Sequence, residues 1–297
     1  MIKNKDGLTE EEYLASYDIS AFDQPSVTVD MLLFTITDQA VENYRKLDEK
    51  ELKVLLIQRN EHPFIGRWAI PGGFVKMDEN LKNAAYRELK EETGVDNAYL
   101  EQLYTYGDVD RDPRGRIIST AYMSLVNADE IKMEAGSDAD DAKWFHVTYE
   151  IIKKEKSVEE EKECIRTVIE LTLRHEDIVL KSSILVEKTV EGRHVSYDRS
   201  IISNDGLSFD HALIIQYGLE RLRSKLEYTD IIFHMMPDLF TLTALQRSYE
   251  EILDKKLLKA NFRRKTAKFV EETDVYTSDA GHRPSRLFKF NPNWMEV

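Results

Sequence analysis

Cysteine, long apolar runs and a signal-like N-terminus are features that this sequence lacks or nearly lacks. Cys164 is the single cysteine among 297 residues, which excludes an intramolecular disulfide and fits a reducing compartment. No apolar run reaches the roughly 18 residues of a membrane-spanning helix, and the polar N-terminus has no apolar signal core. We therefore expect a cytoplasmic protein, in which Cys164 is a half-buried packing residue rather than a reactive thiol.

The chain also lacks an excess of basic residues. Its 41 Lys+Arg against 55 Asp+Glu give a formal net charge of −14. This balance argues against nonspecific nucleic-acid binding by the chain as a whole, but it leaves room for a local basic patch. The length suits one large domain or two ordinary domains, with enough apolar residues for a packed core.

The stretch from Gly73 to Val95 has the clearest local pattern in the chain. Its apolar residues Leu81, Ala85 and Leu89 recur at helical spacing, and Asp78 is a good N-cap. Gly94 supplies the left-handed C-cap that ends such a helix. The pattern predicts an amphipathic helix of about 15 residues behind a glycine-containing turn.

Three carboxylates lie on one face of this helix. Glu88, Glu91 and Glu92 occupy positions i, i+3 and i+4, where they repel one another unless a cation is present. A hard divalent ion suits them, because Mg²⁺ binds a few carboxylates and also accepts phosphate oxygens. The turn at Gly72 and Gly73 leaves backbone groups free to approach such an ion or a phosphate. The arrangement therefore favours attack of a metal-activated water on a diphosphate, although an acidic pair on a helix is more often a solvated face.

The spacing of the whole stretch resembles the Nudix box: Gly, five residues, Glu, seven residues, then Arg-Glu-aliphatic-any-Glu-Glu-any-Gly-aliphatic. All of its fixed positions are matched, by Gly73, Glu79, Arg87, Glu88, Leu89, Glu91, Glu92, Gly94 and Val95. The lead-in Trp-Ala-Ile-Pro-Gly-Gly from Trp68 is also typical of Nudix proteins.

The resemblance implies a Nudix fold, which is an α+β structure with a mixed sheet sandwiched by helices. It also implies hydrolysis of nucleoside diphosphates linked to another group, with Mg²⁺ or Mn²⁺ as cofactor. If the roles known for the Nudix box are carried over to this sequence, the metal would be held by Glu88, Glu91, Glu92 and the Gly72 carbonyl. One of these carboxylates could act as base. Glu79 would pair with Arg87 and fix the helix in place.

The segment GDVDRDPRGR (Gly107 to Arg116) joins two expected strands. Hairpin chemistry alone could explain its Asp-Pro and Arg-Gly steps. Alternatively, Arg111, Arg114 and Arg116, together with Arg59, bind an anionic ligand. The segment and the following IISTAYMSLV resemble ADP-ribose pyrophosphatases and the Nudix-related regulators of NAD metabolism. This resemblance implies ADP-ribose or a related nucleotide sugar as ligand.

The alternation of apolar residues predicts strands on both sides of the box, at 27–36, 52–58, 99–106 and 117–126, with another starting at Ala142. An acidic loop before Ala142 offers one more metal ligand among residues that we cannot rank: Glu134, Asp138, Asp140 and Asp141. Residues 1–25 are expected to be partly extended.

The region 150–205 departs from the compact Nudix pattern. The dense mixed-charge run at 153–163 predicts a helix, and strands at 178–187 and 193–202 predict a hairpin insertion. A helix at 208–226 is then expected to close a first domain that spans residues 1–228. His211 near its start is interpreted as a structural histidine, with a ligand or base as the less favoured alternative.

From residue 229 to residue 297 the composition changes, with 11 Lys+Arg against 10 Asp+Glu. A capping-box start at Thr243 predicts a helix to about Leu253, with Leu245, Tyr249 and Ile252 buried. A second helix is expected at 259–270, with Phe262, Ala267 and Phe269 inward. A hairpin at 273–290 would form a wing, so that the segment is a winged helix-turn-helix. Seven basic residues and no acidic residue lie within 255–268.

The residues predicted to face DNA are Asn261, Arg263, Arg264, Lys265 and Lys268, with Arg283 and Arg286 on backbone phosphates. The alternative is a small accessory domain with solvated charges. The C-terminal winged helix of Nudix-related transcriptional regulators is similar to three sequence segments of this chain: PDLFTLTALQRSYEEIL, NFRRK and GHRPSRLFKF. That resemblance implies binding to double-stranded DNA and a homodimer.

Two hypotheses follow. The first, preferred because the box residues are chemically specific, is a pyrophosphohydrolase that acts on ADP-ribose or a related nucleoside diphosphate derivative. The second is a transcriptional regulator whose Nudix domain senses such a ligand and changes the spacing of two winged helices in a dimer.

Overall fold

A computed structural model describes residues 2–39, 49–95, 98–128, 142–159, 162–277 and 284–296. The central strand, β1 (Ser26–Gln39), is buried on both faces from residue 28 to residue 36. It pairs with β6 in parallel and with β2 antiparallel, so the sheet is mixed. The strand order is β10-β9-β8-β7-β2-β1-β6-β5, with short β3 on β2 and short β4 on β1.

The remaining strands of this sheet have the following bounds: β2 Glu49–Gln58, β3 Trp68–Ala69, β4 Gly72–Phe74, β5 Tyr99–Tyr106, β6 Ile117–Leu125, β7 Ala142–Glu159, β8 Lys162–His175, β9 Ile178–Glu191 and β10 His194–Asp205. The strands expected from the sequence in this part of the chain are therefore present, with ends shifted by a few residues.

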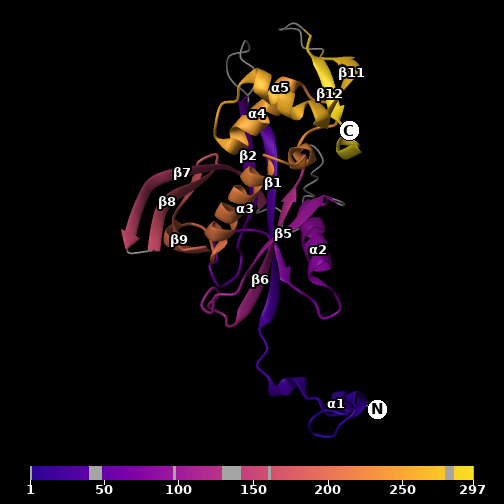
Figure 1. Cartoon of the computed structure of the whole chain (residues 1–297), viewed down its shortest axis with the longest axis vertical. Helices are drawn as coiled ribbons and strands as arrows, with labels where there is room; N and C mark the ends of the chain where they lie inside the picture. Colours follow the sequence, from indigo (N-terminus) through magenta and orange to yellow (C-terminus); the bar gives the residue numbers. More distant parts are fainter. Residues whose placement is uncertain are drawn as a thin grey trace.

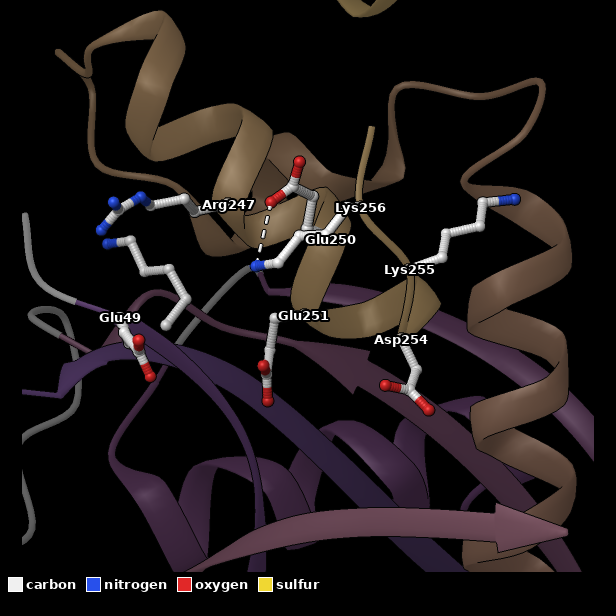
Figure 2. A pocket seen from close by; sticks show the side chains of 8 residues that line it. Glu49, Arg247, Glu250, Glu251, Asp254, Lys255 and Lys256 are labelled. Atoms are coloured by element: carbon white, nitrogen blue, oxygen red, sulfur yellow. Dashed lines mark hydrogen bonds and ion pairs between the residues drawn. The ribbon is translucent and has the colours of Figure 1, made fainter. Parts of the chain in front are cut away.

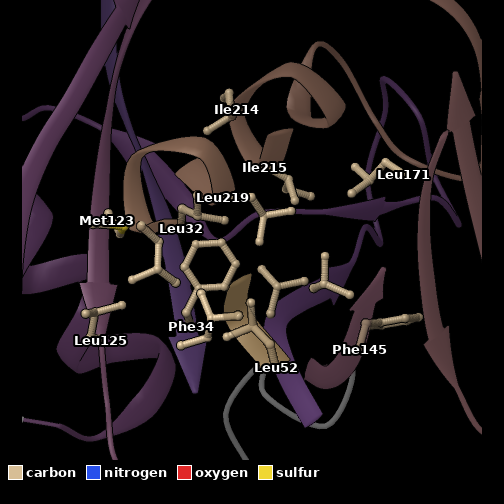
Figure 3. Packing of buried hydrophobic residues seen from close by; sticks show 14 of the residues in the cluster. Leu32, Phe34, Leu52, Met123, Leu125, Phe145, Leu171, Ile214, Ile215 and Leu219 are labelled. Carbon is tan, nitrogen blue, oxygen red and sulfur yellow. The ribbon is translucent and has the colours of Figure 1, made fainter. Parts of the chain in front are cut away.

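Alternate residues of β1 divide the core into two layers, because successive side chains of a strand point to opposite faces. Met31 and Leu33 pack toward α2 (Leu81–Thr93) with Ala85 and Leu89. Leu32 and Phe34 pack toward α3 (His211–Lys225). Figure 3 shows the second layer, where Ile214, Ile215 and Leu219 of α3 meet the sheet. The expected sandwich of helices around a mixed sheet is confirmed (Figure 1).

Helix α2 begins at a different residue from the one expected. Asn80, not Asp78, is the N-cap, and its side chain accepts a hydrogen bond from the backbone of Asn83. An Asn side chain caps as well as an Asp side chain, so residue preference alone could not choose between them. The predicted end of the helix is confirmed, since Gly94 has φ 68° in the left-handed region.

The helix predicted at 153–163 is wrong, because β7 extends to Glu159 and β8 begins at Lys162. Its mixed charges form ion pairs along β7 and between β7 and β8, such as Lys153–Glu155 and Lys156–Glu163, each at 2.7 Å. The expected hairpin insertion is likewise part of a longer array, since β7, β8, β9 and β10 pair in succession and continue the main sheet (Figure 1).

The N-terminal segment also contains structure that was not expected. Helix α1 (Glu10–Ser16) has a capping box in which the side chains of Thr9 and Glu12 bond reciprocally to backbone amides. The Thr-x-x-Glu spacing is the signal that could have revealed it. A 3-10 turn, η1 (Ile19–Ala21), follows. None of the residues of α1 is buried, and the helix lies away from the sheet (Figure 1).

The C-terminal segment forms the predicted winged helix. Its elements are η4 (Ile231–Met235), α4 (Leu242–Leu253), α5 (Lys259–Thr266), η5 (Ala267–Phe269), β11 (Val270–Tyr276), β12 (Arg286–Phe290) and η6 (Trp294–Glu296). Strands β11 and β12 pair antiparallel and form the wing. Leu245, Tyr249 and Ile252 are buried as expected.

Three details of the winged helix differ from the prediction. Thr241, two residues earlier than Thr243, caps α4 by accepting a hydrogen bond from the backbone of Ala244. The second helix ends at Thr266 rather than near residue 270, because the chain tightens into η5. This change of pitch turns Ala267 to the surface and buries Thr266 instead.

The buried hydrophobic cluster runs without a break from the sheet through α3 into α4 and α5, across the boundary expected at 228/229. Among the described helices, none is long and apolar enough to cross a membrane.

Candidate functional site

The glycine turn before α2 is held against β1. In β4, Gly72 pairs with Asp30 and Gly73 pairs with Val29. A Cβ on Gly72 would lie 2.4 Å from the Val29 carbonyl oxygen, and one on Gly73 would lie 2.2 Å from a Glu88 carboxylate oxygen. The backbone contact at Gly72 leaves no room for a side chain, and a Cβ at Gly73 would push the Glu88 carboxylate away. Glycine is therefore needed here for close approach of the backbone to the carboxylate.

Arg87 ties the carboxylates of the box together. Its guanidinium donates two hydrogen bonds to Glu79, at 3.1 and 2.7 Å, in the pairing that the sequence predicts. It also donates to Glu88 at 2.6 Å and to Glu91 at 3.1 Å. The bonds from Arg87 are the main reason that the pKa of Glu79 falls to about 2, and they raise the pKa of Arg87 itself.

The donor set of the box has the chemistry of a site for a hard divalent ion. Burial raises the pKa of the Glu88 carboxyl, and a bound cation would lower that pKa again. Because Gly73 has no side chain, there is space beside the oxygen atoms of Glu88. Glu91 is more open, with 56% of its side chain exposed, and Glu92 is half-buried. Among the described residues no group of three possible metal ligands is assembled, and Glu88 and Glu91 both accept hydrogen bonds from Nη1 of Arg87 instead.

The candidates for an additional ligand, Glu134, Asp138, Asp140 and Asp141, lie outside the described residues.

Beside the box, Arg111 is clamped between the buried Asp30 and the half-buried Asp210. Its guanidinium donates to both carboxylate oxygens of Asp210, at 2.9 and 2.7 Å, and lies 3.5 Å from Asp30. Asp30 in turn accepts a 2.6 Å hydrogen bond from the Ser119 hydroxyl. Burial opposes the charge of Arg111, but the bonds to Asp210 outweigh it and its pKa is raised. The cluster links β1, β6, the 107–116 segment and the start of α3.

His211 has the structural role that the sequence analysis favours. Its Nδ1 accepts a 2.9 Å hydrogen bond from the backbone N–H of Ile70, just before the glycine turn. Burial lowers the pKa of His211, because the charged imidazolium would be desolvated. The neutral tautomer with a lone pair on Nδ1 is the form that fits this bond.

This contact predicts a pH dependence of stability. The folded-state pKa of His211 lies below the ~6.5 of an unfolded histidine, so the unfolded chain takes up the proton first as pH falls. The contribution of His211 to the free energy of unfolding is therefore fully present above about pH 6.5 and declines as the pH falls below that value. We expect a lower midpoint of thermal unfolding at pH 5.5 than at pH 7.5, and a smaller difference in His211→Asn, whose amide oxygen can accept the same bond.

His194→Asn is the matched control, because His194 is exposed on β10. An equal pH response in wild type and His211→Asn would contradict the assignment.

A hollow next to the box gathers three of the four arginines predicted to bind ligand. Arg59, Arg111 and Arg114 line it with Gly72, Gly73, Asp30, Asp112, Phe74, Phe209 and His211 among others. Arg116 lies elsewhere, and its guanidinium donates to the carbonyl oxygens of Gly107 and Asp108.

Sequence reasoning missed Asp30, Phe74 and Phe209, which line this hollow, and the bond of Asp210 to Arg111. Asp30 had a usable signal, since it is one acidic residue inside the apolar run VTVDMLLF. Asp210 and Phe209 become recognisable only when the start of α3 is folded against the 107–116 segment, whereas Phe74 follows the glycine turn directly in β4.

The residues predicted to face DNA do not all point the same way. Asn261, Arg263 and Arg264 are exposed on α5. Lys265 instead reaches the Leu226 carbonyl at 3.4 Å, and Lys268 lies over the ring of Trp294 at 4.5 Å.

On the wing, Arg286 pairs with Glu272 and with the Tyr276 hydroxyl, and it lines a groove with Arg263 between α5 and the wing. Arg283 lies outside the described residues.

The winged helix is joined to the sheet by polar contacts as well as by the core. Glu251 of α4 lies 3.2 Å from His146 of β7 and accepts a hydrogen bond from the Leu52 backbone at 3.3 Å. Next to this contact, a cavity of about 430 Å³ opens between α4 and β2 (Figure 2). Its acidic and basic side chains are interspersed, and Glu250 pairs with Lys256.

Comparison with known protein families finds a match for the N-terminal part and for the C-terminal part of the chain. Residues 40–168 match the NUDIX domain, and residues 232–290 match the NrtR DNA-binding winged helix domain. The ADPR responsive transcriptional repressor NtrR of Acinetobacter baylyi is 32% identical over 286 residues, which cover 95% of this chain and 88% of that protein.

Two further relatives support the match, one over nearly the whole chain and one over the Nudix part. The crystal structure of Shewanella oneidensis NrtR complexed with a 27mer DNA is 28% identical with a TM-score of 0.62, and the match covers 91% of this chain and 96% of that one. The ADP-ribose pyrophosphatase of Methanocaldococcus jannaschii is 45% identical over 97 residues, which are 33% of this chain and 56% of that protein. The chain therefore belongs to the family of Nudix proteins that carry a C-terminal NrtR-type winged helix.

Proposed function

We propose that this protein is a DNA-binding regulator that responds to ADP-ribose or a closely related nucleoside diphosphate derivative. The observation that carries the proposal is the position of α3. Its N-cap Asp210 and its first residue His211 are bonded to Arg111 and Ile70, respectively, beside the box. Near its other end, Arg223 donates a 2.7 Å hydrogen bond to the Ile252 carbonyl at the end of α4. A ligand in the hollow would therefore act directly on the helix that supports the winged helix.

The charges of the side chains at the hollow support the proposed ligand. Arg59 and Arg114 present cations to the hollow, and burial together with the charge of Arg114 lowers the pKa of Arg59. A diphosphate would relieve this repulsion. Glu88, Glu91, Glu92 and the Gly72 carbonyl would hold Mg²⁺ or Mn²⁺, which would neutralise the phosphate oxygens. The names of two relatives, an ADPR responsive repressor and an ADP-ribose pyrophosphatase, support ADP-ribose as the ligand.

The proposed DNA-binding surface is formed by α5 and the wing. Arg263 and Arg264 of α5, with Asn261, are the residues we propose to enter the major groove, with Arg286 near the phosphates. The functional units would be residues 1–228 for the ligand and residues 229–297 for DNA, acting in a cytoplasmic homodimer. Ligand binding can change DNA affinity only if it favours one arrangement of the winged helices over another.

DNA binding is tested by selecting duplexes from a random-sequence library with the full chain. The enriched duplex is then titrated with the protein by fluorescence anisotropy at several salt concentrations. The proposal predicts one enriched sequence and affinity that falls steeply with salt. Enrichment of no sequence would contradict the regulatory function.

Hydrolysis of the same ligand is a second candidate function, favoured by the complete box and by the similarity to the pyrophosphatase. Divalent ions in such a site lower the pKa of water and stabilise the charge that develops on phosphate. The part left to the chain is to take the proton of the attacking water with a box carboxylate and to hold the diphosphate near Arg59.

Glu92→Gln is expected to lower release of AMP from ADP-ribose at least about 100-fold, because the amide can neither hold a cation strongly nor accept a proton. Glu155→Gln, at an exposed position of β7, is the control. AMP release is measured with Mg²⁺ beside circular dichroism of both variants. Unchanged turnover in a folded Glu92→Gln variant would contradict its assignment to the site.

A further inference from the structure

The chain after β12 folds back onto the end of the helical segment that contains α5. Residues 291–296, which we call the C-terminal strap, begin with Asn291. Its backbone N–H donates a 2.8 Å hydrogen bond to the Phe269 carbonyl, and its side-chain amide donates a 3.1 Å bond to the Lys268 carbonyl. Both carbonyls belong to η5, which continues α5 directly. Carbonyl groups at the end of a helical segment lack partners within it, so Asn291 supplies two donors that fix the strap to this end.

Trp294 strengthens this attachment with its ring. The ring contacts that of Phe269 edge to face, with 4.7 Å between the ring centres, and only 2% of Phe269 is exposed. The Lys268 ammonium lies 4.5 Å from the centre of the Trp294 ring and 4.7 Å from that of Phe269. Aromatic pairs, and cations over ring faces, attract each other at these separations. Trp294 therefore packs on the same two residues whose carbonyls accept hydrogen bonds from Asn291.

The indole N–H of Trp294 reaches the turn after α3. It donates a 3.0 Å hydrogen bond to the carboxylate of Asp230, which lies 64 positions earlier in the chain. Asp230 lies between α3 and η4, and the preceding Thr229 hydroxyl donates a 2.8 Å bond to the Lys225 carbonyl in α3. A hydrogen bond to a carboxylate is stronger than one between neutral groups. Trp294 thus joins the end of η5 to the end of α3.

This connection is separate from the one that runs through α4. There, Arg223 of α3 bonds to the Ile252 carbonyl of α4. In turn, Tyr249 of α4 contacts the Phe262 ring of α5 edge to face, with 5.4 Å between the ring centres. The α4 connection therefore holds α5 near its middle, whereas the strap holds the segment at its end. An element that is held at one point can pivot, but one held at two points keeps its orientation relative to its supports.

We infer that the C-terminal strap fixes the orientation of α5 relative to α3, with Trp294 as the positioning residue. The inference rests on the proposed function and adds a route by which a ligand-dependent shift of α3 would reach α5. Without the bond to Asp230, α5 would still be folded and basic, but it would follow α3 less closely. The strap thus governs the response of DNA binding to ligand more than the contacts with DNA.

The test removes this bond from each end in the full chain. Trp294→Phe keeps a ring against Phe269 but loses the N–H donor, and Asp230→Ala loses the acceptor. Hydrogen exchange of the backbone amides of 259–269 should become at least about fivefold faster in both variants, with the amides of 211–222 in α3 unchanged. The double variant should match either single variant, because both changes remove the same bond. Asp230→Asn, which keeps an acceptor oxygen, should restore slow exchange.

A second readout separates positioning from a merely structural role. The affinity for the selected duplex is measured with and without saturating ADP-ribose and Mg²⁺. In Trp294→Phe and in Asp230→Ala, the ratio of these two affinities should fall to less than about half of the wild-type value. Met295→Ala is the control for both readouts and should change neither, since 78% of Met295 is exposed in the same turn as Trp294.

Two results would overturn the role of the strap. One is unaltered exchange of 259–269 in both single variants, and the other is an unaltered affinity ratio despite faster exchange. A wild-type protein whose duplex affinity does not respond to ADP-ribose, with the expected change of exchange in the variants, would instead overturn the proposed function and support the hold of the strap on α5.

Discussion

Replacing Arg263 and Arg264 together by alanine is expected to lower the affinity for the selected DNA duplex by at least about 30-fold. Both side chains are exposed on α5, the most basic helix of the described chain, and Arg263 also lines the groove toward the wing. Each lost contact to a base or phosphate removes roughly 1 kcal/mol or more. The slope of log affinity against log salt should fall by about 2, because fewer counterions are released from the DNA.

The control for this double variant is Lys153→Ala with Lys154→Ala, which removes two exposed charges from β7 and should leave the slope unchanged. Anisotropy titrations at four salt concentrations measure both quantities. An unchanged slope in a folded Arg263→Ala, Arg264→Ala protein would show that another surface contacts the DNA.

Arg111→Met should destabilise the protein by about 3–5 kcal/mol, which is the cost of leaving buried charges without their partner. The side chain of Arg111 is 5% exposed, and those of Asp30 and Asp210 are 11% and 12% exposed. Methionine fills much of the same space but leaves two carboxylates facing each other. The start of α3 would then lose its anchor at the hollow, so the response of DNA binding to ligand should weaken as well.

Urea unfolding followed by circular dichroism measures this effect. Arg116→Met is the matched control, since Arg116 lies in the same segment but bonds exposed carbonyl oxygens, and its loss should cost little. Adding Asp210→Asn to Arg111→Met should recover part of the lost stability. Equal unfolding midpoints for Arg111→Met and Arg116→Met would contradict the clamp.

The contrast between these two arginines shows what the sequence could and could not predict. Within GDVDRDPRGR both had equal weight as ligand-binding residues, because the chemistry of each is the same. Only the folded chain brings Asp30 and Asp210, which are 81 and 99 positions away from Arg111, to its guanidinium. Contacts of such separation leave no local pattern, so the clamp could not be predicted.

Local patterns were predictable where one physical reason dominates. Gly94 ends α2 because the left-handed conformation suits glycine, and the Glu79–Arg87 pair is the one that the resemblance to the Nudix box implies. The run at 153–163 was misassigned because alternating charges suit a solvated helix and an exposed strand equally well. Its pairing with β8 decides between them.

The directions of the basic side chains in and after α5 also could not be predicted from the sequence. Lys265 and Lys268 had the same charge as Arg263 and Arg264 in the sequence. In the folded chain, Lys265 of α5 reaches the Leu226 carbonyl, and Lys268, which lies in η5, is held over the ring of Trp294. Composition predicted the basic surface, but the direction of each side chain depends on where the helix is buried.

The central claim is that ligand binding beside the Nudix box is coupled to DNA binding, and one pair of titrations tests it most directly. The affinity for the selected duplex is measured with and without saturating ADP-ribose and Mg²⁺, and the affinity for ADP-ribose is measured with and without the duplex. Coupling through α3 predicts that both affinities change by the same factor, of at least about fivefold, because linkage is reciprocal. Tight binding of both ligands with neither affinity altered by the other would contradict the account.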